Sequence, residues 1–298
     1  MDMDKPLQIV EVSPRDGLQN EAAVISTDDK LALVRTLIAS GARRIEVTSF
    51  VNPVRVPQMA DADELARRLP RGDVSWIGLV LNERGLDRAL TAGMDEVNFV
   101  VVATDTFSRR NQGVDVDAAV GVWARIAARA KAAGLRTTVT IGAAFGCPFE
   151  GEVGVERVAD VLRRCADAQP DEIALADTIG VGVPAQVRAL ADAAHEVAPG
   201  IPQRWHFHNT RNGGYANALA AAELGASALD ASSGGIGGCP FAPNATGNIA
   251  TEDLLYLLHR SGFSTGLDTG ALLPLADRLT SLLGHQVPGQ LARAGLFP

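Results

Sequence analysis

The chain has 298 residues, of which 47% are hydrophobic and 21% are charged, a composition typical of a globular enzyme. Its 27 Lys and Arg residues are outnumbered by 35 Asp and Glu residues, which gives a formal net charge of −8. This acidic balance argues against a general nucleic-acid-binding protein, which would carry a basic face. No run of about 18 uncharged apolar residues occurs, so a membrane-spanning helix is not expected.

Cysteine usage and the N-terminal residues indicate where the protein works. The three cysteines, Cys147, Cys165 and Cys239, are odd in number and far apart, so a disulfide framework is not expected. A reducing cytoplasm fits this pattern best. The segment from Met1 to Pro6 carries charged residues and no apolar stretch, and we therefore expect no secretory signal there.

Short apolar runs alternate with longer helical patterns along most of the chain. The predicted strands are Gln8–Val12, Arg44–Thr48, Trp76–Leu81, Glu96–Val102, Thr137–Gly142, Glu172–Ala176, Arg204–His208 and Ala228–Ala231. The clearest helical segments are Asp28–Ser40, Asp115–Ala133, Gly154–Ala168, Pro184–Val197 and Gly213–Leu224. Strand–helix units in this number and length are typical of a (β/α)8 TIM barrel, an α/β fold.

An open doubly wound sheet is the alternative fold. It would need a glycine-rich nucleotide loop after an early strand, but the sequence after Val12 is Ser-Pro-Arg-Asp-Gly. We find no internal repeat or linker, so residues 1–298 are expected to form a single catalytic domain. A further helical pattern, Thr269–Leu283, lies in a C-terminal extension at about residues 264–298 and is expected to pack on the barrel or to lie across its mouth.

Helix ends can also be predicted. Thr27 precedes the first helical segment and is expected to be its N-cap. Gly41, Gly93, Gly134 and Gly225 follow helical stretches, where a residue in the left-handed conformation commonly ends a helix.

Polar residues gather where the predicted strands end. In a TIM barrel these carboxyl ends form one face, which carries the active site. The residues concerned are Arg15, Asp16, Gln19, Glu46, Ser49, Asp177, Thr178, His206 and His208, followed by a glycine-rich loop that leads through Cys239 to Asn248. We therefore predict one site on this face, with Gln19, Ser49, Asp177 and Thr178 in contact with the substrate.

His206 and His208 form the most informative pair. Because they are two residues apart on a strand, both side chains point to the same face and can reach one metal ion. Two hydrogen-bonded core histidines are the structural alternative. A His-X-His pair on a buried strand, in a chain with only five histidines, favours metal binding.

Two further residues can complete this metal site. Asp16 is the natural carboxylate partner, although Asp before Gly17 is also a common turn residue. Asn248 offers an amide oxygen, but it equally precedes a helix start and can act as a cap. A carboxylate, two imidazoles and an amide suit Mg²⁺ or Mn²⁺, and they also admit Co²⁺, Zn²⁺ or Fe²⁺.

Arg15 and the cysteines carry the remaining chemistry. The planar fork of Arg15 can hold a thioester or enolate oxygen on which charge develops, although an arginine at a strand end is often a surface ion-pair residue. Cys239 follows several glycines, and this loop position favours proton transfer over simple burial. Cys147 is either a structural residue near the mouth or a neighbour of the site, and Cys165 is expected to pack a helix.

Several ordered segments resemble the 3-hydroxy-3-methylglutaryl-CoA (HMG-CoA) lyase family, within the DRE-TIM metallolyase group. The resemblance runs from about residue 8 to about residue 268. The matching segments are Glu11-Val12-Ser13-Pro14-Arg15-Asp16-Gly17-Leu18-Gln19-Asn20-Glu21, Thr48-Ser49-Phe50-Val51, Val56-Pro57-Gln58-Met59-Ala60-Asp61, Gly146-Cys147-Pro148, Asp177-Thr178-Ile179-Gly180-Val181-Gly182 and Gly237-Gly238-Cys239-Pro240.

The resemblance implies an enzyme that cleaves HMG-CoA into acetoacetate and acetyl-CoA, the last step of leucine breakdown. Its metal ligands would be Asp16, His206, His208 and Asn248. Arg15 would stabilise the enolate, Glu46 would be a supporting acid, and Cys239 would be the catalytic cysteine on a lid. An acyl-CoA thioester is then the expected partner, and a homodimer the expected assembly. The base that removes the hydroxyl proton is either His206 or Asp16.

The sequence departs from the family pattern at three positions, which are Asn209, Arg211 and Ala22. The family often has Asp, Tyr and Lys there. These departures leave open a lyase for a related 3-hydroxyacyl-CoA, such as a longer branched or a citramalyl-CoA-like thioester. A condensing enzyme of the same group and a non-catalytic binding scaffold are the remaining alternatives. The scaffold would not need Arg15, the two histidines and Cys239 together.

Overall fold

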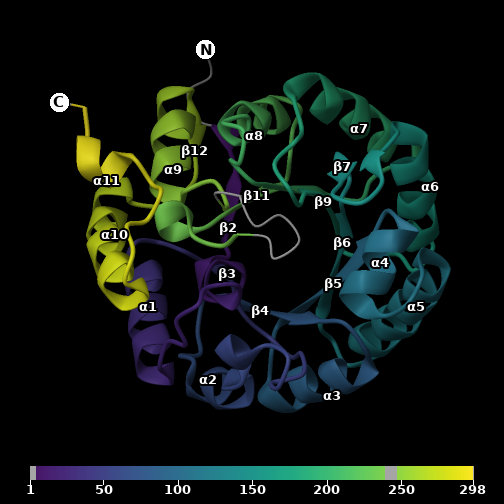
Figure 1. Cartoon of the computed structure of the whole chain (residues 1–298), viewed down its shortest axis with the longest axis horizontal. Helices are drawn as coiled ribbons and strands as arrows, with labels where there is room; N and C mark the ends of the chain where they lie inside the picture. The colour runs from purple at the N-terminus through teal and green to yellow at the C-terminus, as the bar shows by residue number, and fades with distance from the viewer. Residues whose placement is uncertain (1–4, 239–246, 298) are drawn as a thin grey trace.

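The computed structural model describes residues 5–238 and 247–297 and contains a closed barrel of parallel strands (Figure 1). Around the barrel the hydrogen-bonded order is β10-β11-β2-β3-β4-β5-β6-β9. The strands are β2 (Gln8–Glu11), β3 (Arg44–Ser49), β4 (Ser75–Val80), β5 (Glu96–Val102), β6 (Arg136–Gly142), β9 (Glu172–Asp177), β10 (Gln203–Phe207) and β11 (Ala228–Ala231). The predicted TIM barrel is therefore confirmed, and the open sheet is excluded.

A ring of helices surrounds the strands (Figure 1). It comprises α1 (Thr27–Ala39), α2 (Ala62–Arg68), α3 (Glu83–Ala92), α4 (Asp105–Gln112), α5 (Val116–Ala132), α6 (Val155–Ala166), α7 (Pro184–Val197), α8 (Gly214–Glu223) and α9 (Thr251–Arg260). Two pairs of short strands lie outside the barrel: β1 (Lys5–Pro6) pairs with β12 (Phe263–Ser264), and β7 (Gly146–Cys147) pairs with β8 (Gly151–Glu152). Three short helical turns are η1 (Ser13–Gly17), η2 (Pro57–Met59) and η3 (Ser233–Gly235). No helix within the described ranges is long and apolar enough to cross a membrane.

The C-terminal extension packs on the outside of the barrel. Helix α10 (Thr269–Leu283) lies against α1 and α9, and α11 (Leu291–Ala294) lies against α9 and α10 (Figure 1). The amide of Gly289 also donates to the carbonyl of Gly234, 2.9 Å away, in the turn after the last barrel strand. Of the two placements expected for this segment, the structure shows the one against the barrel wall.

The helix ends predicted from glycines are found in the structure, whereas the predicted N-cap of α1 is not. Gly41, Gly93, Gly134 and Gly225 all have positive φ, as expected of residues that end helices. The N-cap of α1 is Ser26, whose hydroxyl accepts from the amide of Asp29, so the prediction of Thr27 was wrong by one residue. Ser26 has the extended backbone that a cap requires, whereas Thr27 is already helical.

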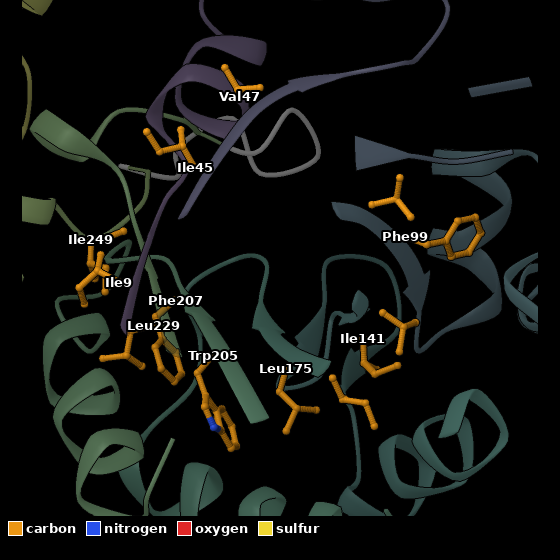
Figure 2. Close-up of a cluster of buried hydrophobic side chains, with 14 of the residues drawn as sticks. Ile9, Ile45, Val47, Phe99, Ile141, Leu175, Trp205, Phe207, Leu229 and Ile249 are labelled. Carbon is orange, nitrogen blue, oxygen red and sulfur yellow. The ribbon is translucent and has the colours of Figure 1, made fainter. Parts of the chain in front are cut away.

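Apolar side chains fill the layer between the strands and the helices. Figure 2 shows Ile9, Ile45, Phe99, Leu175 and Trp205 in this layer, and all of them are buried. On β10, Trp205 and Phe207 stack with ring centroids 6.0 Å apart. Because side chains alternate along a strand, Arg204 and His206 of β10 must face the opposite side, the barrel interior.

The barrel interior is mainly polar, which is unusual for a fold whose centre is commonly filled by branched aliphatic residues. At its amino end, Arg44 forms ion pairs with Glu96 and with Glu172, whose nearest oxygen is 2.7 Å away. The hydroxyl of Thr138 donates to Glu96 at 2.6 Å. These charges are buried, so each depends on its partner for the stabilisation that water would otherwise provide.

Replacing Arg44 by Met should lower the free energy of unfolding by about 3 to 5 kcal/mol, because Glu96 and Glu172 would stay buried without their main counter-ion. Chemical denaturation followed by circular dichroism measures the loss. Arg136→Met is the control, since the Arg136 side chain is 43% exposed and lies 3.6 and 3.4 Å from the same two carboxylates. A loss for Arg44→Met no larger than for this control would contradict the prediction.

Candidate functional site

The turn after β2 holds Arg15 and Asp16 in place. The amides of Arg15, Asp16 and Gly17 all lie within 3.2 Å of the Val12 carbonyl, which makes the tight turn η1. Gly17 is needed here because a Cβ atom would come within 2.8 Å of Ile236 and 2.9 Å of Ser232. The first strand therefore presents an arginine and a carboxylate side by side at the carboxyl end of the barrel.

His206 on β10 and His208, directly after this strand, face the carboxylate of Asp16. Their Nε2 atoms lie 3.9 and 4.0 Å from Oδ2 of Asp16, too far for hydrogen bonds. One ligand atom from each of these residues lies within 4.8 Å of the others, the arrangement expected around a shared ion. Nδ1 of His206 lies 3.1 Å from Oδ2 of Asp230, which fixes the ring with Nε2 toward Asp16.

The electrostatics of Asp16 and His208 fit a divalent metal ion, whereas the raised pKa of His206 favours its protonated form. Burial alone would raise the pKa of Asp16, but Arg15 and the two imidazoles outweigh it and lower that pKa to about 2. Burial and the neighbouring His206 lower the pKa of His208 to about 3. Burial opposes charge on His206 as well, yet its hydrogen bond to Asp230 raises its pKa. At neutral pH, Asp16 is thus an anion and His208 a neutral imidazole, the forms that bind metals.

Asn248 lies beside Asp16. Its Nδ2 donates to Oδ2 of Asp16 at 2.8 Å and to the carbonyl of Ile236 at 3.0 Å. No hydrogen bond to its Oδ1 is found within the described residues, so Oδ1 is the amide atom available to a metal. The alternative role as a helix cap is excluded, because Ala250 occupies the N-cap of α9.

Arg15 is held by two carboxylates. It forms an ion pair with Glu46 through Nε and Nη2, and its Nη1 lies 2.5 Å from Oδ1 of Asp16. Glu46 also accepts from Nδ2 of Asn98 at 2.9 Å. Burial alone would lower the pKa of Arg15, but Glu46 and Asp16 raise it. Arg15 is therefore a permanent cation at the edge of the site.

A cavity of about 170 Å³ opens above these residues. One part of its wall is apolar, formed by Leu79, Val100 and Ala176, and another is polar, formed by Asn98 and Thr140. Of the predicted site residues, those that line it are Arg15, Asp16, Gln19, Thr178, His206 and His208. A small ligand in this cavity would meet the arginine, the carboxylate and both imidazoles at once.

Other predicted residues lie next to the cavity lining. Ser49 donates to Oε1 of Gln19 at 2.7 Å, and Glu46 supports Arg15 from behind. Asp177 accepts from the amides of Val181 and Gly182, both at 2.9 Å, and so organises the loop after β9. Ser49 and Asp177 are not among the residues that line the cavity, and their expected contact with the substrate stays a prediction.

The cysteines divide into three cases. Cys147 is buried in β7, is not among the residues that line the cavity, and accepts a hydrogen bond from the hydroxyl of Thr104, 3.1 Å away. Cys165 is buried in α6, as expected of a packing residue. Cys239 lies outside the described residues.

Sequence reasoning missed three interior residues, Asp230, Asn98 and Arg204. Asp230 and Asn98 line the cavity, and Arg204 lies below it with no exposed surface. The signal that could have found them is a polar residue at every second position of an otherwise apolar strand. Arg204 precedes His206 by two residues, and Asp230 lies between Leu229 and Ala231.

Comparison with known proteins agrees with this geometry. The model of the HMGL-like family matches residues 6–279. An (R)-citramalyl-CoA lyase of Chloroflexus aurantiacus is 44% identical, covering 96% of this chain and 94% of its own. A hydroxymethylglutaryl-CoA lyase of Pseudomonas mevalonii is 40% identical, covering 97% and 96%. The structure of an HMG-CoA lyase from Acinetobacter baumannii with coenzyme A and 3-methylmalate superposes with a TM-score of 0.92 at 38% identity, covering 98% of this chain and 97% of its own.

Replacing His208 by Ala should abolish tight Mn²⁺ binding, because it removes a buried neutral nitrogen that faces Asp16. Electron paramagnetic resonance of free Mn²⁺ during a titration measures the affinity. His195→Ala is the control, since His195 is exposed on α7. Unchanged Mn²⁺ affinity in a folded His208→Ala protein would rule out His208 as a ligand.

Proposed function

The chain belongs to the HMGL-like family, and on this premise we propose that it is a metal-dependent lyase that cleaves a 3-hydroxyacyl-CoA thioester to release acetyl-CoA. The observation that carries the proposal is the convergence of Asp16, His206 and His208 next to Arg15 at one cavity. Relatives across nearly the full length of the chain are lyases for such thioesters, and a similar structure was solved with coenzyme A.

Asp16, His206, His208 and Asn248 would hold the metal, with Mg²⁺ and Mn²⁺ as the proposed ions. When bound, a divalent ion supplies a Lewis acid that lowers the pKa of the substrate hydroxyl and neutralises charge on its carboxylate. The proton of that hydroxyl passes to His206 or to Asp16, both of which line the cavity. Loss of this proton lets the C–C bond break in the retro-Claisen sense.

Arg15 would stabilise the other product of the cleavage. The breaking bond leaves an enolate of acetyl-CoA, whose oxygen carries the negative charge, and a fixed guanidinium is suited to hold it. Glu46 and Asp16 fix this guanidinium from two sides, so little reorganisation is needed when the charge develops. We propose that Cys239 then protonates the enolate carbon.

We propose HMG-CoA as the substrate, with (R)-citramalyl-CoA as the second candidate. The second is favoured by the 44% identical citramalyl-CoA lyase, and the two acids differ by one methylene in the carboxylate arm. Neither Asn209 nor Arg211, two of the departures from the family pattern, is among the residues that line the cavity. Oδ1 of Asn209 accepts from the amide of Gly214, and Arg211 donates to the carbonyls of Ile179 and Gly180. Leucine breakdown, a cytoplasmic location and a homodimer are parts of the same proposal.

A panel of CoA thioesters incubated with Mg²⁺ or Mn²⁺ tests the function, with acetyl-CoA release as the measurement. We expect turnover of HMG-CoA or of (R)-citramalyl-CoA, with one preferred by about 10- to 200-fold, the discrimination that a single methylene commonly provides. Release from HMG-CoA yields acetoacetate, and release from citramalyl-CoA yields pyruvate, so the second product identifies the substrate. No acetyl-CoA from any 3-hydroxyacyl-CoA would contradict the lyase function.

Cys239→Ala should lower kcat by about 100- to 10,000-fold, the usual contribution of a positioned proton donor. Mn²⁺ affinity should stay near that of the wild type, because Cys239 is not one of the proposed ligands. Cys165→Ala is the matched control, since Cys165 is buried in α6 away from the cavity. Near-full turnover of the Cys239→Ala protein on its best substrate would exclude the proton-transfer role.

A further inference from the structure

Arg204 lies between the two carboxylates that hold the site. Its side chain has no exposed surface. Nε lies 3.3 Å from Oδ1 of Asp230, and Nη2 lies 3.7 Å from Oε2 of Glu46. These contacts are ionic, since no hydrogen bond of its guanidinium is found among the described residues.

In each of these carboxylates, one oxygen lies near Arg204 and the other contacts a residue of the site. Asp230 turns Oδ1 toward Arg204 and Oδ2 toward Nδ1 of His206. Glu46 places Oε1 on Arg15, while its Oε2 accepts from Nδ2 of Asn98 at 2.9 Å and lies 3.7 Å from Nη2 of Arg204. One buried cation is thus a common neighbour of the groups that orient His206 and Arg15.

We infer that Arg204 is a positioning residue, which sets the orientation of His206 and Arg15 by holding Asp230 and Glu46 in place. The inference rests on the proposed function, because it assigns Arg204 a role toward the metal ligand and the enolate-binding arginine. Without Arg204, the charges of Asp230, Glu46 and Glu172 would repel one another in a space closed to water. Either carboxylate could then turn away, and the side chain that it holds would turn with it.

A purely structural role is the competing explanation. Nε of Arg204 is also 3.5 Å from Oε1 of Glu172, a carboxylate that is not part of the cavity lining and that pairs mainly with Arg44. If Arg204 served only to balance Glu172, removing both charges together would leave the site unchanged. The two roles therefore predict different results for a paired substitution.

The test compares two double variants that remove the same charges from the barrel interior. Arg204→Met/Glu172→Gln leaves Asp230 and Glu46 without their shared cation, whereas Arg44→Met/Glu172→Gln removes an arginine that contacts neither. Each double variant loses one positive and one negative charge, so the net charge of the barrel interior is the same in both. Circular dichroism and thermal unfolding establish that both are folded.

Mn²⁺ affinity, measured without substrate by electron paramagnetic resonance, is the first readout. We expect affinity to fall by about 10- to 100-fold in the Arg204 double variant, the usual effect of losing a group that orients a metal ligand. It should stay close to wild type in the Arg44 double variant. Turnover of the best thioester is the second readout, and kcat should fall far more than KM changes.

Rescue by a conservative variant completes the test. Arg204→Lys keeps the positive charge, and its Mn²⁺ affinity and kcat should both be higher than those of the Arg204→Met/Glu172→Gln variant. Equal Mn²⁺ affinity in the two folded double variants, or no recovery with Lys, would overturn the role of Arg204 while leaving the lyase function intact. If the wild-type protein binds no Mn²⁺, the proposed metal site fails, and this inference fails with it.

Discussion

Buried arginine–carboxylate contacts fill the centre of the barrel and fix the side chains above them. Water is excluded there, so each charge keeps its place only because an opposite charge lies beside it. The carboxylates are Asp16, Glu46, Glu96, Glu172 and Asp230, and the fully or nearly buried arginines are Arg15, Arg44 and Arg204. These carboxylates outnumber the arginines, and a divalent cation beside Asp16 and the two histidines would offset part of the difference.

The two faces of each strand carry different tasks. On β10, Trp205 and Phe207 pack against the helices and hold the fold together, while Arg204 and His206 point inward and serve the site. On β3, Ile45 and Val47 pack outward, and Arg44 and Glu46 belong to the interior charges. Because successive side chains of a strand point to opposite faces, neighbouring residues alternate between packing against the helices and facing the barrel interior.

Sequence reasoning predicted the barrel and much of its site because these follow from local patterns. Strand periodicity gave the β–α units, and the spacing of His206 and His208 placed both imidazoles on one face. It missed Arg204 and Asp230 because their role depends on contacts between distant strands. It also could not show that Ser49 and Asp177, both expected to contact the substrate, hydrogen-bond to Gln19 and to a backbone amide. The chemical type of a residue at a strand end limits the roles that its side chain can have. The residues that contact it in the fold determine which of these roles it has.

The order of the strands around the barrel also has a consequence for synthesis of the chain. Asp16 follows the first barrel strand, His206 lies on the seventh, and the eighth strand closes the wall between them. The amide of Gly289, near the end of the chain, is tied to the turn after that eighth strand. A nascent chain therefore carries Asp16 apart from the two histidines until the last barrel strands have been made. The proposed metal ligands come together only when β11 pairs with both β10 and β2, so the proposed site forms as the barrel closes and not before.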